Sequence, residues 1–245
     1  MKRLLTTLCT VAALQTVAQE SLVPGSPSIQ QQWIRNDAYT MTWYMLRDTA
    51  RFEMATVRTK IDAGKKQLTV STEVMMKGAK QSWIDSTIAQ RKTLAPVYHS
   101  SYNMQRDMVL HFGQVVKGTY YDKIKKQQKE LADTVRSPFF DSNLYPLLTG
   151  WLPLAEGYTA VLTIYDFNPE RKSGLMKAHI TQVSAGTYAS AKAGVREVWK
   201  VTVKDEISGM DSGYSVYYLD KADRRLWKQE IVAGPRRMEM VRVED

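Results

Sequence analysis

The histidines of this sequence are the first candidates for catalysis or metal binding, because imidazole can act in both roles. The three histidines, His99, His111 and His179, are 12 and 68 residues apart. None belongs to an HxH pair, which would place two imidazoles on one strand face, and a metal site needs such a cluster of ligands. We therefore expect packed or surface histidines, and the sequence predicts no metal site and no cofactor.

Local catalytic and phosphate-binding motifs do not occur in the sequence. It contains no GxSxG, HExxH, GxxxxGK[ST] or GxGxxG pattern, each of which fixes reactive or phosphate-binding groups by local geometry. The serine of Gly209–Gly213 has the wrong offset from its glycines, and this composition is typical of a hairpin turn. We predict that the protein is not an enzyme. An envelope hydrolase with a site assembled from distant residues stays open as an alternative.

The first 18 residues have the features of a secretory signal peptide. Two basic residues precede an apolar run over 4–17, and the small residues Thr16 and Ala18 occupy the positions that signal peptidase reads. A membrane anchor is the alternative, but the run is shorter than the ~20 apolar residues of a spanning helix. We predict cleavage after Ala18, no transmembrane segment in the mature chain, and export to the periplasm, the inner face of the outer membrane or the exterior. The one cysteine, Cys9, belongs to the removed segment.

Basic residues outnumber acidic ones, with 34 Lys and Arg against 25 Asp and Glu and a net charge of +9. Export and the lack of an RNA-binding motif argue against a nucleic-acid partner. A positive field would instead attract an anionic envelope surface, whereas dispersed solvated charge is the alternative. The residues expected to make this contact are Lys123, Lys125, Lys126, Lys129, Arg224, Arg225, Arg236 and Arg237.

Apolar and polar residues alternate with period two along most of the mature chain, which is typical of antiparallel strands with one buried face. Residues 39–45 and 67–76 show the pattern most clearly. A change of face near Ala55 indicates a β-bulge. Further strands are predicted over 52–61, 83–88, 108–112, 158–167, 175–183, 195–203, 214–219, 226–232 and 238–243.

These strands predict a mainly β protein with a curved antiparallel sheet, a half-open β-barrel, and one or two short helices in its central connection. Residues 19–32 are rich in Pro, Ser and Gln and are expected to be a flexible lead-in. Residues 33–245 are expected to form a single domain. Within the connection, residues 121–136 predict a short exposed helix or an ordered loop, and residues 144–149 predict a short helix.

Large apolar side chains on the strands are the strongest candidates for a binding site. Met and aromatic residues together make an adaptable lining for lipid, lipoprotein or another amphipathic ligand, although an ordinary packed core beneath the helix is the alternative. Leu147, Leu148 and Trp151 are expected to cover the hollow. The proposed lining is Met41, Trp43, Val70, Val74, Leu110, Phe112, Leu147, Trp151, Leu162, Ile164, Trp199 and Tyr217.

Three sequence segments resemble an uncharacterised family of exported proteins of Gram-negative bacteria, a domain-of-unknown-function family. They are FDSNLYPLLTGWLPLAEGY, the turn Gly186-Thr187-Tyr188, and the hairpin from Tyr217 to Lys228. The hairpin is also similar to that of periplasmic lipoprotein carriers of the LolA and LolB type. The resemblance covers roughly residues 35–243 and implies an unclosed barrel whose concave apolar face is covered by helices or loops. In the carriers this hollow receives acyl chains. The resemblance carries over no catalytic residues, and the Lys-rich central segment departs from the carriers.

Overall fold

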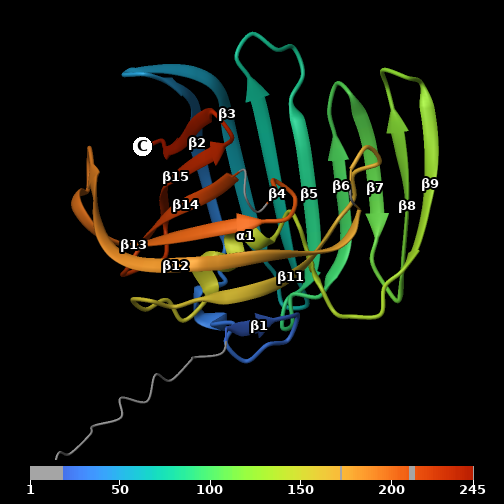
Figure 1. Cartoon of the computed structure of the whole chain (residues 1–245), viewed down its shortest axis with the longest axis horizontal. Helices are drawn as coiled ribbons and strands as arrows, with labels where there is room; N and C mark the ends of the chain where they lie inside the picture. The colour runs from blue at the N-terminus through green and yellow to red at the C-terminus, as the bar shows by residue number, and fades with distance from the viewer. Residues whose placement is uncertain (1–18, 172, 210–212, 245) are drawn as a thin grey trace, which may run out of the picture.

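The structure of the protein is a computed structural model that describes residues 19–171, 173–209 and 213–244. The predicted signal peptide and the middle of the predicted turn Gly209–Gly213 lie outside the described residues. The described chain forms one curved sheet of 16 strands that does not close into a barrel (Figure 1). The predicted fold class is therefore confirmed.

Two groups of consecutive strands make up most of the sheet. The first group consists, in sheet order, of β2 (Asp37–Arg47), β3 (Ala50–Ala63), β4 (Gln67–Met76), β5 (Trp83–Gln90), β6 (Pro96–Tyr102), β7 (Arg106–His111), β8 (Val115–Asp122) and β9 (Gln127–Thr134). The second consists of β11 (Ala160–Asp166), β12 (Gly174–Ser190), β13 (Gly194–Asp205), β14 (Gly213–Asp220), β15 (Leu226–Ala233) and β16 (Arg236–Arg242).

The last strand of the chain joins the two groups. β16 pairs antiparallel with β2, with Met240 opposite Trp43. At the outer edge of the second group, β1 (Glu20–Leu22) and β10 (Phe140–Asp141) both pair parallel with β11. Every other pairing between neighbouring strands is antiparallel, as alternating sequences with one buried face favour.

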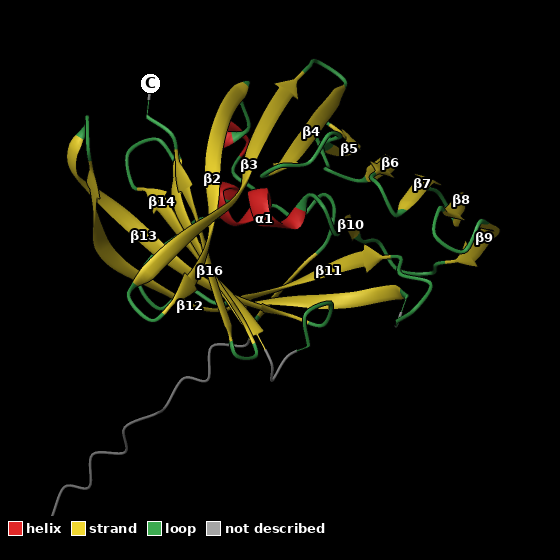
Figure 2. Ribbon diagram, turned by 90° about the horizontal axis from the view of Figure 1, so that it is seen from above, coloured by secondary structure: helices red, strands yellow, loops and turns green. Residues whose placement is uncertain are grey.

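The central connection crosses the concave side of the sheet, where Figure 2 shows α1 (Tyr145–Leu148). The 3₁₀ turn η2 (Thr149–Trp151) follows directly. Leu148 is buried, and the Tyr145 hydroxyl donates to Asp205 Oδ2 on β13 at 2.7 Å. These contacts hold α1 against the second group of strands. The predicted short helix, with its side chains on the sheet, is thus confirmed.

The prediction for residues 121–136 is wrong, because this segment is mostly strand and forms neither a short helix nor an ordered loop. It completes β8, turns at Lys126 with φ of 53°, and continues as β9. β9 is the edge strand, and most of its side chains are exposed on both faces. Such a strand needs no apolar face, so its sequence has no period of two.

A second prediction that the structure corrects is the flexible lead-in over residues 19–32. β1 extends the sheet beside β11, and Leu22 and Ile29 are buried in the core. This segment is held mainly by backbone hydrogen bonds, including those of β1 to β11. Such bonds leave no apolar period in the sequence, so its composition alone indicated flexibility. A 3₁₀ turn, η1 (Gln31–Trp33), follows it.

Of two sequence predictions about strand geometry, one is confirmed and one is wrong. The bulge expected near Ala55 is confirmed, because Trp43 faces Ala55 while Tyr44 faces Glu53, which leaves Met54 as the extra residue. The turn expected at residues 186–188 is wrong, since β12 continues through it. Gly186 lies opposite Val198, and a Cβ there would come within 2.6 Å of the Lys200 side chain. Glycine at this position gives room for a neighbouring side chain within the ladder.

Candidate ligand-binding groove

An apolar groove of about 310 Å³ runs along the junction between the two strand groups, beside α1. This volume lies at the small end of the range for ligand sites, ~300–1,000 Å³. The polar side chains of the lining belong to Thr59, Thr72, Asn143 and Gln229. The rest of the lining is Tyr39, Met41, Trp43, Val57, Val70, Val74, Trp83, Pro146, Leu147, Tyr217, Leu226, Ile231 and Met240.

Strand register brings the groove residues to one face. Met41 lies opposite Val57, and Trp43 opposite Met240. Alternate side chains of a strand point to the same face, so these residues all reach the concave side. α1 supplies the facing wall through Pro146 and Leu147. The groove therefore exists only where β16 meets β2 and where the helix lies across that junction.

A small pocket of about 50 Å³ adjoins the groove. Lining residues common to the two are Tyr39, Pro146, Leu147, Tyr217 and Leu226. The wall of the pocket is completed by residues that include Trp33, Arg35, Asp37, Trp151, Asp223, Arg224 and Arg225. The apolar groove thus lies beside a pocket that is lined by arginines.

Arg224 is held over the pocket by a strained turn between β14 and β15. Its φ of 60° lies in the left-handed region, which a non-glycine residue adopts at some cost. The Arg224 N–H donates to the Asp220 carbonyl at 2.9 Å. Its guanidinium lies 5.0 Å from the centre of the Trp33 ring. Backbone and ring together fix the position of this cation.

The Arg224 guanidinium is not satisfied by the described residues. Its Nε and Nη1 atoms are buried and have no hydrogen-bond partner there. Burial lowers the pKa of this group, because the charged form loses hydration. Most buried polar atoms in proteins are paired, so an arginine with two unpaired nitrogens beside a pocket is a feature to be explained.

The two carboxylates in the pocket wall each lie near an arginine other than Arg224, one outside the pocket and one in its wall. Asp37 lies 3.7 Å from Arg242, and Asp223 lies 3.5 Å from Arg225. Arg35 donates to the Asp223 carbonyl oxygen at 2.8 Å, and it has no carboxylate partner within the described chain. The pocket therefore has more positive than negative charge.

A second polar cluster lies deeper in the hollow and connects β5, β6 and β10. His99 Nδ1 is 2.9 Å from Asp141 Oδ1, and Thr87 donates to Asp141 Oδ2 at 2.6 Å. The Asn143 backbone N–H donates to Asp141 Oδ1 at 3.1 Å, and its side chain donates to Thr87. Both oxygens of the buried carboxylate are thus partnered.

Burial alone would lower the pKa of His99, but the charge of Asp141 and the bond to it outweigh this effect, so the pKa is raised. The pair meets the hydrogen-bonding distance that a hydrolase site would need. Its side chains, however, are only 9% and 1% exposed. Neither residue lines the groove, whereas Asn143 does. The cluster is arranged to hold strands and connection together.

The structure separates the twelve predicted lining residues into five places. Leu162 and Ile164 are fully buried in the main core, and Leu110 and Phe112 belong to a second cluster under β7. Trp199 lies half-buried beneath Lys221, and Trp151 lines the small pocket. The residues that line the groove are Met41, Trp43, Val70, Val74, Leu147 and Tyr217. Leu148, expected in the cover, is core.

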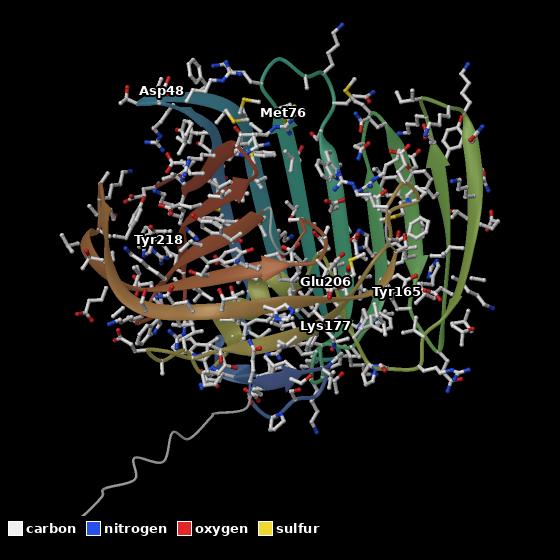
Figure 3. The ribbon with its side chains drawn as sticks, in the orientation of Figure 1. Asp48, Met76, Tyr165, Lys177, Glu206 and Tyr218 are labelled. Carbon is white, nitrogen blue, oxygen red and sulfur yellow. The ribbon has the colours of Figure 1, made fainter. Side chains whose placement is uncertain are left out.

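The eight predicted surface cations lie at three distant sites. The four lysines belong to the β8–β9 hairpin at the sheet edge, where Lys123 pairs with Asp107 and Lys125 with Glu170. Arg224 and Arg225 precede β15, and Arg236 and Arg237 follow it. Arg237 lies opposite Leu46, near the turn whose Asp48 is labelled in Figure 3. The structure does not bring these cations together.

Sequence reasoning missed several residues of the groove and pocket. Met240 and Ile231 follow the same alternation as the predicted residues and could have been found from it. Trp33 and Arg35 could not, because they belong to a segment with no periodic signal. His99 and Asp141 are 42 residues apart, and no local spacing indicates their contact.

Within the described residues, no cluster of three or more His, Cys, Asp or Glu side chains could hold a metal ion. No helix in this part of the chain is long and apolar enough to cross a membrane.

Comparison with known proteins gives one match. No curated protein and no solved structure is similar to the chain, so the likeness to LolA and LolB stays a prediction. A family model described as a protein of unknown function, DUF3108, matches residues 38–241, which covers both strand groups and the central connection. The chain therefore belongs to the DUF3108 family.

Proposed function

We propose that this protein is a non-catalytic, exported binding protein whose groove holds the apolar chain of an amphipathic lipid. The groove itself is the observation that carries the proposal. Its lining is predominantly aliphatic, aromatic and Met side chains, and it includes buried core residues such as Met41, Val70 and Tyr217. A sheet that needed only a filled core would be covered completely by its connection.

The side chains of the lining suit a flexible chain better than a rigid polar molecule. Met41 and Met240 are unbranched and polarizable, so they adapt to ligands of loosely defined shape. Polar groups such as Thr59 and Gln229 are few and separated, and a sugar or peptide would leave its own polar groups unpaired there. An acyl chain loses no hydrogen bonds on entering.

The signal-like first 18 residues support a role outside the cytoplasm. In a Gram-negative cell this would be the periplasm, the inner face of the outer membrane or the exterior. A protein that shields an acyl chain in a groove can carry or hold a lipid or a lipoprotein in water, where exposed hydrocarbon would aggregate.

The experiment is a pair of variants on neighbouring residues of β15. Ile231 lines the groove, while Val232 points to the opposite face of the same strand. A fluorescent acyl probe should bind wild-type protein with a saturable affinity, and Ile231→Trp should abolish binding by filling the groove. Val232→Trp should bind as wild type does.

Native mass spectrometry of protein recovered from its own envelope gives an independent measurement. A lipid mass should accompany wild type and Val232→Trp but not Ile231→Trp. If no lipid is retained and the probe shows no saturable site, the groove is not a lipid site. A structural or protein-interaction module would then be the better description.

A further inference from the structure

We infer that Arg224 forms an anion subsite at the end of the groove, and that the ligand therefore has a small anionic head group, a carboxylate or a phosphate. This inference rests on the proposed function, because the acyl chain would lie in the groove while the head group reaches the pocket. It specifies which amphipathic molecules the protein selects.

The pocket and the groove adjoin and share part of their lining. Tyr39 and Tyr217 of the sheet and Leu147 of α1 border both. In the inferred complex, the chain of the ligand lies along Met41 and Trp43, and its polar end extends past these shared residues to Arg224. A purely apolar ligand would leave that end unused.

The state of Arg224 indicates what the polar end should be. Its Nε and Nη1 are buried and unpartnered within the described chain, and the Trp33 ring lies 5.0 Å from the guanidinium. Both nitrogens are donors only. An oxyanion satisfies such donors with charge-assisted hydrogen bonds, which are stronger than neutral ones.

The surrounding charges agree with an anion. The nearby carboxylates Asp37 and Asp223 each have another arginine partner. Arg35 adds a further cation to the pocket wall. The pocket thus keeps an excess of positive charge after its internal ion pairs are formed.

Pocket size limits the head group. At ~10–15 Å³ for each water-sized group, about 50 Å³ holds a carboxylate or a phosphate but not a sugar ring. Long-chain carboxylates and monoalkyl phosphates fit this limit. A glycolipid would have to keep its sugars outside.

The test compares palmitate, hexadecyl phosphate and hexadecanol, which share one alkyl chain and differ in the head. Wild type should bind at least one anion about tenfold or more tightly than the alcohol. Arg224→Gln should weaken that anion by about ten- to a hundredfold, the range of a charge-assisted hydrogen bond, and leave hexadecanol unchanged. Comparing the two anions shows whether the pocket accepts carboxylate, phosphate or both.

Two further variants keep the experiment decisive. Arg237→Gln removes the same charge from an exposed position on β16 and should change none of the three affinities. Asparagine tolerates positive φ, so the Arg224→Asn variant should fold even if Arg224→Gln does not. Equal binding of the anions and the alcohol, unaffected at Arg224, overturns the subsite while the groove stands. No binding of any of the three overturns the groove and the subsite together.

Discussion

Two buried polar sites lie on the concave side of this sheet, and they differ in how their charges are satisfied. At the His99–Asp141 pair, each carboxylate oxygen has partners from neighbouring strands and from the connection. At Arg224, two buried nitrogens have no partner among the described residues. A fully paired cluster stabilises the fold, whereas a buried cation without a partner stabilises it only when something else supplies the charge.

The largest effect should come from breaking the satisfied site. Asp141→Ala removes the acceptor for His99, Thr87 and the Asn143 backbone, and leaves their polar groups buried. We expect the free energy of unfolding to fall by about 3–5 kcal/mol, measured by urea denaturation. Asp62→Ala, at an exposed position of β3, should change it by less than about 0.5 kcal/mol. A loss at Asp141 as small as the control would show that the cluster is not structural.

Raising the pH should have a smaller effect on stability through the same site. The pKa of His99 is raised above its ordinary value of 6.5, so its ion pair stabilises the fold fully below about pH 6.5. That stability is lost as the pH rises through the higher folded-state pKa.

Thermal unfolding at a series of pH values should therefore show wild type exceeding His99→Gln by the most in mild acid. The difference should shrink as the pH rises above neutrality. His179→Gln is the matched control, since no Asp or Glu pairs with that residue in the described chain. A wild-type advantage that grows with pH would contradict the assignment.

Substitution of Arg224 should have the smallest effect on stability, and it should stabilise the lipid-free protein where Asp141→Ala destabilises it. In lipid-free protein, Arg224→Asn removes a half-buried cation whose Nε and Nη1 are unpartnered and suits the left-handed backbone, so the free energy of unfolding should rise by about 0.5–1 kcal/mol. Saturating palmitate should reverse the order, because only wild type gains from the bound anion. Differential scanning calorimetry with and without ligand measures both. A clear loss of stability without ligand would place Arg224 with the satisfied cluster.

Strand periodicity predicted much of the fold because most strands bury one face. It found β2, β3 and β4, and even the bulge beside Ala55. It missed β6, whose inner face carries His99 and Ser101 in place of apolar residues, and β9, which has no buried face. Where a strand faces a polar cluster or solvent on both sides, its sequence does not alternate.

Periodicity predicted the candidate site less well, for a related reason. It assigns a residue to a face but does not say which part of that face the connection covers. Met41 and Leu162 therefore looked alike in sequence, and both are buried in the core, although only Met41 lines the groove. Arg224 was chosen for its charge as a surface residue, and only the folded structure shows that its Nε and Nη1 atoms are buried.

The pairing of β16 with β2 also determines when the binding site can form. Met240 and Trp43 are separated by nearly the whole chain, so their contact requires the closure of a very long loop, which is slow compared with local hairpins. A ribosome-bound or truncated chain that ends before β16 has hairpins but no groove. Under the proposed function, only chains that include β16 would capture a lipid.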